Sequence, residues 1–112
     1  IITAANAKIV ICLAQSQHSD INEKVRAAVS GCAGVTVLLE VNIAGLCNPE
    51  SAELSKENFD ILDFDSSIAK MNGTSLSTGR KFSADHKAAY FHTGGTTGRP
   101  KLAQLTHRNM AS

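Results

Sequence analysis

The feature that most constrains this chain is a run rich in glycine and threonine, which lies between two apolar stretches. The run extends over residues 90–101 and reads Tyr-Phe-His-Thr-Gly-Gly-Thr-Thr-Gly-Arg-Pro-Lys. Its closely spaced glycines let the backbone approach a large anion. The flanking apolar residues predict a buried strand at 88–93 and a returning strand at 101–105, so residues 94–100 are expected to form the tip of a hairpin.

The side chains of this run are suited to binding a polyphosphate. Threonine hydroxyls and backbone N–H groups can donate hydrogen bonds, and Lys101 adds a positive charge. A Walker A loop needs glycine before the lysine and serine or threonine after it, but Pro100 and Leu102 stand there. The dinucleotide fingerprint needs a glycine at the position of Thr93. Both of these phosphate loops are therefore excluded.

The run resembles the phosphate loop of the adenylate-forming (AMP-binding) superfamily. That loop usually reads Tyr-Thr-Ser-Gly-Thr-Thr-Gly-x-Pro-Lys-Gly and is followed by Thr-His-x-Asn, which here is residues 106–109. Roughly ten positions agree in order, so the resemblance is specific. Gly94 replaces the usual serine and Leu102 the usual glycine. This variant is similar to the loop of fatty-acyl-CoA synthetases.

The resemblance implies an acyl-CoA synthetase, an acid–thiol ligase that activates a carboxylate with ATP and then transfers the acyl group to CoA. The carboxylate is expected to be a fatty acid. Lys101 is implied as the catalytic residue, which stabilises the departing pyrophosphate. The residues expected to bind the ATP phosphates all belong to the loop: Thr93, Gly94, Gly95, Thr96, Thr97, Gly98 and Lys101. Mg²⁺ is expected to accompany ATP, with ligands mostly outside this chain.

The histidine of the Thr-His-x-Asn segment is His107. The resemblance implies that it lies near the acyl pocket and contacts the substrate. A second interpretation stays open, in which His107 begins a helix capped by Thr106 and makes only a local hydrogen bond. Other functions of the loop also stay open: a non-catalytic phosphate-binding or nucleotide-binding module, a nucleotide hydrolase, or an adenylate-forming ligase for an aryl or amino acid.

The N-terminal third of the chain predicts a βαβ unit. Residues 8–13 are rich in β-branched side chains and are expected to form a strand buried on both faces. Residues 20–29 follow as a helix, and residues 35–41 as a second strand. A right-handed crossover makes the two strands parallel. The predicted fold class is therefore α/β, a fragment of a mixed, mainly parallel sheet with helices, joined to the phosphate-loop hairpin.

Details of the helix and of the following segment complete this prediction. Asp20 and Glu23 have the spacing of a capping box. Residues 45–83 lose periodicity and are expected to be surface loop with short helical turns, whose residues 61–64 contact the sheet. The helix is expected to turn one apolar face to the sheet, formed by Ile21, Val25, Ala28 and Val29.

Composition narrows the class of protein and its setting. The net charge of +1 gives no basic character of the kind that nucleic-acid binding needs. The apolar runs are too short to form a transmembrane segment. The three cysteines lack Cys-x-x-Cys spacing, which favours reduced thiols and a cytoplasmic setting.

The length of 112 residues limits what this chain is expected to do. Members of the superfamily run to several hundred residues, and the sequence starts at Ile1 rather than at methionine. We therefore expect residues 1–112 to be part of an N-terminal adenylation domain, inactive without the remainder of the parent enzyme. Its other partners are expected to be the small-molecule substrates. A sheet taken from a larger domain is expected to leave open edges and faces.

Overall fold

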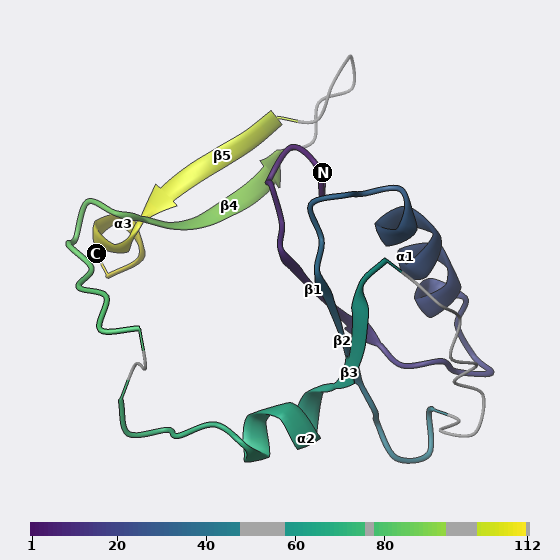
Figure 1. Cartoon of the computed structure of the whole chain (residues 1–112). Coiled ribbons are helices and arrows are strands. Elements are labelled where there is room, and N and C mark those ends of the chain that lie inside the picture. Colours follow the sequence, from purple (N-terminus) through teal and green to yellow (C-terminus); the bar gives the residue numbers. More distant parts are fainter. Residues whose placement is uncertain (48–57, 76–77, 94–100, 112) are drawn as a thin grey trace. The chain divides into compact units, whose positions relative to one another are not determined.

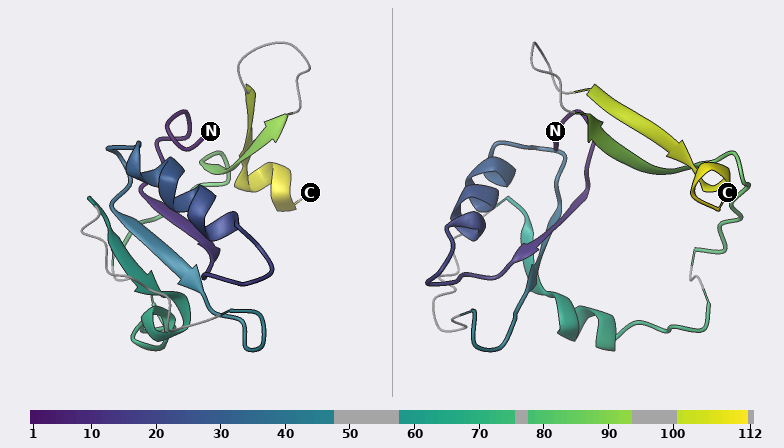
Figure 2. Two further views of the ribbon diagram at one scale, coloured as in Figure 1. Left: turned by 90° about the vertical axis from the view of Figure 1, so that its right-hand side faces the viewer. Right: turned by 180° about the vertical axis from the view of Figure 1, so that it is seen from behind.

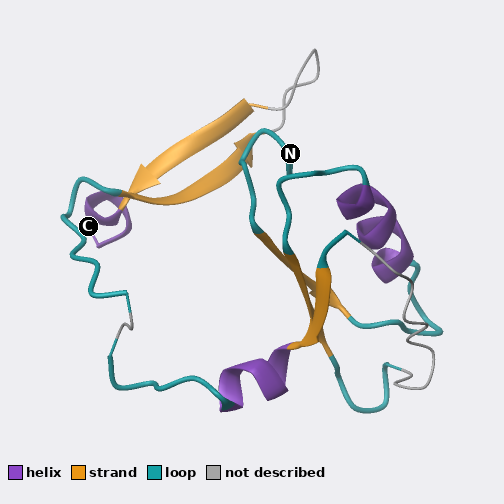
Figure 3. Ribbon diagram, in the orientation of Figure 1, coloured by secondary structure: helices purple, strands orange, loops and turns teal. Residues whose placement is uncertain are grey.

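The computed structural model describes residues 1–47, 58–75, 78–93 and 101–111. The chain divides into two compact units: a sheet unit, residues 2–71, and a hairpin unit, residues 72–112 with Ile1. In these described ranges, the sheet unit contains three strands and two helices, and the hairpin unit contains two strands and one helix (Figures 1 and 3). The predicted α/β class is confirmed. Within the described ranges, no helix is long and apolar enough to cross a membrane.

The sheet unit is built on a parallel sheet in the order β1-β2-β3. Strand β1 (Ile9–Leu13) pairs in parallel with β2 (Val37–Val41), and α1 (Ile21–Ser30) connects the two. Strand β3 (Asp60–Asp63) pairs in parallel with the other edge of β2. Helix α2 (Phe64–Ala69) follows directly from the carboxyl end of β3 (Figure 1). The predicted βαβ unit with parallel strands is therefore confirmed.

The third strand corrects the prediction for residues 45–83. That segment was expected to be surface loop with short helical turns; α2, at residues 64–69, fits this expectation, but residues 60–63 form the strand β3. The strand has only four residues, and an aspartate stands at each end of it. It lies at the edge of the sheet, where polar ends can stay in water, so its sequence carries little apolar signal. Ile61 does contact the sheet, as expected, because it packs against the core.

Helix α1 covers one face of the sheet, but with a different stripe from the one predicted. The core consists of Val29, Val35, Leu38 and Phe59, and Val25 packs against it. Residues 22, 25, 26 and 29 face the sheet, which is the i, i+3, i+4, i+7 pattern of a helix. Ile21 and Ala28 are exposed, so their predicted core positions are wrong. Asn22 donates hydrogen bonds to β1 and β2, and these contacts explain why α1 turns a different side to the sheet than predicted.

The start of α1 also differs from the prediction. Asp20 occupies the N-cap position but makes no side-chain cap hydrogen bond, so the capping box is not formed. Ser19 Oγ accepts a hydrogen bond from the Ile21 N–H at 3.3 Å instead. The Asp20 carboxylate instead forms an ion pair with Lys24, one helical turn later, with Asp20 Oδ2 and Lys24 Nζ 2.8 Å apart. An i, i+4 pair of this kind competes with the capping geometry.

The second face of the sheet is open in the described residues. Ile9 and Ile11 are 54% and 56% exposed, although both belong to a strand that was expected to be buried on both faces. That expectation is wrong for this chain, because α1 covers the face of Val10 and Leu38 only. An exposed aliphatic face of this kind is unusual for a parallel sheet.

The hairpin unit holds two antiparallel strands, β4 (Lys87–Thr93) and β5 (Lys101–Thr106), followed by α3 (His107–Ala111). The right view of Figure 2 shows the two strands side by side, running in opposite directions. The predicted hairpin is therefore confirmed in its strands, while its tip, residues 94–100, lies outside the described residues. The expected burial of β4 is wrong, because Tyr90 and Phe91 are exposed. In the described part of this unit only α3 packs on the hairpin.

Candidate functional site

The mouth of the β4–β5 hairpin brings together two of the predicted site residues. Thr93 is the last residue of β4, Lys101 is the first of β5, and the register pairs them directly. The Thr93 hydroxyl donates a hydrogen bond to the Lys101 carbonyl oxygen at 3.3 Å. Side chains of directly paired residues point to the same face of an antiparallel ladder. The two residues therefore define one face at the base of the predicted phosphate loop.

Lys101 presents a positive charge at this mouth. Its side chain is exposed, and among the described residues no carboxylate forms an ion pair with it. A lysine ammonium carries three donors and no acceptor, so its preferred partner is an anion. An ammonium group at the mouth of the hairpin, with no acidic partner among the described residues, is a suitable group for binding a phosphate.

The remaining loop residues of the prediction lie outside the described part of the chain. These are Gly94, Gly95, Thr96, Thr97 and Gly98. Their proposed contacts with phosphate therefore stay predictions from the sequence. The described strands do fix where this segment starts and ends, because Thr93 and Lys101 are paired across it.

His107 lies at the opposite end of the hairpin from Lys101. Strand β5 separates the two residues by six positions, which corresponds to roughly 20 Å along an extended chain. The His107 N–H donates to the His86 carbonyl oxygen at 3.1 Å, and the imidazole lies 5.9 Å from the Phe82 ring, centroid to centroid. The structure does not bring His107 together with the mouth of the loop. It places the residue at a helix start with a local backbone hydrogen bond.

The Thr-His-x-Asn segment forms a reciprocal helix cap. The Asn109 N–H donates to Thr106 Oγ1 at 3.3 Å, and the Thr106 N–H donates to Asn109 Oδ1 at 3.1 Å. Two backbone donors that a helix start leaves unpaired are thereby satisfied, as in a capping box. The predicted cap by Thr106 is confirmed. The role of Asn109 was missed, although its spacing of three residues from Thr106 was a usable signal.

A short turn before β4 fixes the start of α3. The Arg108 N–H donates to the Ala84 carbonyl oxygen at 2.8 Å, and Arg108 Nε lies 3.0 Å from Asp85 Oδ1. His86 Nδ1 accepts a hydrogen bond from the Ser83 N–H at 2.7 Å. The Arg108–Asp85 pair is largely exposed and contributes little to stability by itself. The start of α3 is therefore held to the turn before β4 mainly by backbone hydrogen bonds.

A polar cluster in the sheet unit was not predicted. Asn22 Nδ2 donates to the Leu13 carbonyl oxygen at 2.9 Å and to Glu40 Oε1 at 2.8 Å. Arg26 Nε and Nη2 donate to the same Glu40 oxygen at 3.0 and 2.7 Å. Burial and the Glu40 charge raise the pKa of the neighbouring Cys12 thiol, although a hydrogen bond from Asn22 and the Arg26 charge act in the opposite direction. A raised pKa disfavours the thiolate, which is the nucleophilic form of a cysteine.

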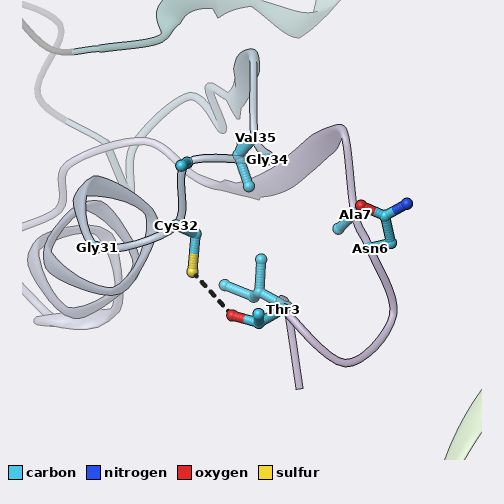
Figure 4. A pocket seen from close by; sticks show the side chains of 9 residues that line it. Thr3, Asn6, Ala7, Gly31, Cys32, Gly34 and Val35 are labelled. Atoms are coloured by element: carbon cyan, nitrogen blue, oxygen red, sulfur yellow. Dashed lines mark hydrogen bonds between the residues drawn. The ribbon is translucent and has the colours of Figure 1, made fainter.

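The sheet unit also contains a hollow of about 200 Å³ beside its N-terminal segment. Figure 4 shows the Thr3 and Cys32 side chains pointing toward one another across it, with Thr3 Oγ1 and Cys32 Sγ 3.5 Å apart. No lining residue carries a charge. The hollow therefore lacks the positive charge that strengthens hydrogen bonds to a nucleotide phosphate.

A magnesium ion has no evident ligand set in the described ranges. Mg²⁺ binds carboxylates and phosphate oxygens. Across residues 1–47, 58–75, 78–93 and 101–111, no three His, Cys, Asp or Glu side chains gather in a way that could hold a metal ion.

Comparisons with known proteins agree with the sequence pattern. The family described as AMP-binding enzyme matches residues 1–112. The chain is similar to the marinolic acid–CoA ligase of Pseudoalteromonas sp. (strain SANK 73390), with 29% identity over 108 residues. The aligned region covers 96% of this chain but only 14% of that relative. No solved structure matches the chain.

Proposed function

The chain belongs to the family of AMP-binding enzymes, and we propose that its β4–β5 hairpin binds the ATP phosphates in an acyl-CoA synthetase. In this proposal the parent enzyme activates a carboxylic acid with ATP and transfers the acyl group to CoA. The name of the similar Pseudoalteromonas protein, a CoA ligase, supports CoA as the acceptor. The likeness of the loop to that of fatty-acyl-CoA synthetases supports a fatty acid as the substrate.

The observation that carries the proposal is the pairing of Thr93 with Lys101 at the hairpin mouth. Because the two residues are paired, the strands that flank the glycine-rich segment end and begin at the same end of the hairpin. The exposed Lys101 ammonium stands at that end without an acidic partner among the described residues. This is the arrangement expected of a loop that closes around an anion.

The chemistry begins when an oxygen of the substrate carboxylate attacks the α-phosphorus of ATP. The new O–P bond gives an acyl-adenylate, and the bond from the α-phosphorus to the bridging oxygen of the β-phosphate breaks. Pyrophosphate leaves with that electron pair, so negative charge builds on the β- and γ-phosphates. Donors already aimed at those oxygens lower the barrier, and each charge-assisted hydrogen bond contributes about 1.5 to 3 kcal/mol. The CoA thiol then displaces AMP.

Within this chain we assign the charge stabilisation to Lys101. Thr96, Thr97 and the backbone N–H groups of Gly95 and Gly98 are proposed as further donors, and Gly94 is proposed to let the backbone approach the phosphates. The Thr93 hydroxyl already donates to the Lys101 carbonyl, so we propose that it contributes chiefly at the base of the loop.

The structure places His107 at the start of α3, at the opposite end of β5 from the mouth of the hairpin. Its roughly 20 Å separation from the mouth along β5 and its backbone contact with His86 support a role in the helix start. Contact of His107 with the carboxylic acid stays a prediction. The cytoplasmic setting and the lack of a nucleic-acid partner likewise stay predictions.

The experiment that tests the proposal is carboxylate-dependent exchange between ATP and pyrophosphate in the full-length parent enzyme. Lys101→Ala should slow this exchange by about 10²- to 10³-fold, the loss seen when one donor to a developing negative charge is removed. Lys87→Ala is the matched control, because Lys87 is an exposed lysine at the other end of the same hairpin. Exchange rates for Lys101→Ala that equal those of the Lys87→Ala control would remove Lys101 from the mechanism.

A further inference from the structure

Asn72 and Gly73 form the one Asn-Gly pair of the chain, in a segment that the proposed function does not use. The pair lies in a turn after α2, where the sheet unit ends at Met71 and the hairpin unit begins at Asn72. Both residues are exposed. Each of the other six asparagines is followed by a residue with a side chain, so only after Asn72 is the next backbone nitrogen not crowded by a Cβ atom.

The Asn72 side chain is held through its oxygen by Thr74. The Thr74 N–H and the Thr74 hydroxyl donate to Asn72 Oδ1 at 3.0 and 2.6 Å. The backbone bond closes an Asx turn, a ring of atoms that contains both Asn72 Cγ and the Gly73 nitrogen. Two donors on one carbonyl oxygen stabilise the negative charge that develops there when a nucleophile attacks the carbon. The turn therefore prepares Asn72 Cγ for attack.

The two nitrogens that take part in such an attack are unpaired within the described ranges. Neither Asn72 Nδ2 nor the Gly73 N–H forms a hydrogen bond with another described residue. A Cβ atom added at Gly73 would meet no atom within 4 Å, so the space beside this residue is open. The Gly73 nitrogen can therefore lose its proton to water, and Nδ2 can leave without breaking a contact.

We propose that Asn72 is a self-modification site, at which the turn itself promotes loss of the side-chain amide. The Gly73 nitrogen gives its proton to water and bonds to Asn72 Cγ, and the carbonyl electron pair moves to Oδ1, where both Thr74 donors bind it. The carbonyl then re-forms as the Cγ–Nδ2 bond breaks. Nδ2 takes up a proton and leaves as ammonia, and a cyclic succinimide remains.

Water opens the succinimide at either of its carbonyl carbons. Attack at Cγ breaks the bond from Cγ to the Gly73 nitrogen and gives aspartate. Attack at the main-chain carbonyl carbon breaks the other C–N bond and gives isoaspartate, whose main chain runs through Cβ and Cγ. Either product replaces a neutral amide with a carboxylate, so the net charge of these 112 residues falls from +1 to 0. Isoaspartate also lengthens the main chain at the boundary between the two units.

Mass spectrometry of the tryptic peptide of residues 71–80 measures the loss of the amide during incubation of the full-length parent enzyme at neutral pH. Thr74→Val removes the hydroxyl donor but keeps the backbone donor, and Thr74→Ser keeps both. Each protein is also incubated in urea, where the turn is not formed.

Asn109 is an internal control for these measurements. Its Oδ1 accepts the same two bonds, from the Thr106 N–H and hydroxyl at 3.1 and 2.8 Å. The nitrogen after it belongs to Met110, which carries a side chain and lies in α3. Asn109 therefore has the donors of the proposed site without its nucleophile.

The proposal predicts that Asn72 loses its amide while Asn109 keeps it. In the folded enzyme Thr74→Val should slow the loss about three- to tenfold, the range for one hydrogen bond, but in urea less than about twofold. Thr74→Ser should match the natural sequence. An Asn72 amide that stays intact would overturn the proposal, and so would a Thr74→Val effect that is absent in the folded enzyme or equally large in urea. None of these readouts depends on Lys101 or on ATP, so this proposal and the proposed function are tested separately.

Discussion

The contact between Arg26 and Glu40 should contribute more to the stability of the sheet unit than an ordinary surface ion pair. The two side chains are only 17% and 12% exposed, and Arg26 binds one Glu40 oxygen through two nitrogens at 3.0 and 2.7 Å. The same oxygen accepts from Asn22, whose side chain is buried. Removing one charge leaves the other in a poorly hydrated place, a change that costs 3–5 kcal/mol for fully buried pairs.

We expect a somewhat smaller cost here, because both groups keep some contact with water. Arg26→Met and Glu40→Leu should each lower the free energy of unfolding by about 2 to 3 kcal/mol, the range for hydrogen bonds to charged groups. The double variant should lose only about 1 kcal/mol, since no unpaired charge is left and apolar groups fill the site. The coupling energy between the two positions should therefore be about 3 to 5 kcal/mol, with a sign showing that the losses do not add.

Urea unfolding of the 112-residue chain, followed by far-ultraviolet circular dichroism, measures these free energies. Lys24→Met is the matched control, because the Lys24–Asp20 pair has a similar distance of 2.8 Å but is 72% and 63% exposed. It should change the free energy of unfolding by less than about 0.5 kcal/mol. If the losses of the two single variants simply add in the double variant, the reasoning about a shared, partly buried charge pair is refuted.

Two further predictions concern pH. Burial and the Glu40 charge raise the pKa of Cys12 above its ordinary value of 9.0, so the folded chain keeps this proton longer than the unfolded chain. The stability that Cys12 contributes should be complete below pH 9 and lost as the pH rises through the higher folded pKa. Cys12→Ala should flatten this alkaline loss in urea titrations, and an unchanged slope would contradict it. Hydrogen bonds from Ser66, its side chain first and then its backbone N–H, lower the pKa of Asp63 below 3.8. The contribution of Asp63 should be present above pH 3.8 and be lost as the pH falls through the lower folded pKa, whereas Asp63→Asn should retain the cap without this dependence in acid-unfolding curves.

The sequence predicted the elements whose local pattern and packing agree. We could recognise β1, α1 and β2 from the sequence because apolar residues of each element form the core or pack against it. The hairpin strands β4 and β5 were recognisable from the glycine-rich segment between them. The cap by Thr106 was also predictable, because Thr106 and the start of α3 are neighbours in the chain.

The errors arose where distant contacts override a local pattern. Asn22 is buried and Ile21 exposed because the Leu13 carbonyl and Glu40, both outside the helix, bind the Asn22 amide. The sequence of residues 20–29 alone does not indicate that Asn22, rather than Ile21, faces the sheet. Strand β3 was missed because its pairing with β2, rather than its own composition, makes it a strand. The site was predictable to the extent that Thr93 and Lys101 flank a hairpin tip, but the contacts of the tip itself depend on residues beyond the described strands.

The central claim is that the hairpin mouth grips the phosphates of ATP, and it is tested most directly by a crystal structure of the parent enzyme with a non-hydrolysable ATP analogue. The account predicts that Lys101 Nζ lies within hydrogen-bonding distance, about 3 Å, of a β- or γ-phosphate oxygen, with the Thr93–Lys101 pair intact beneath the loop. A bound nucleotide whose phosphates lie elsewhere, with the Lys101 ammonium in solvent, would contradict it.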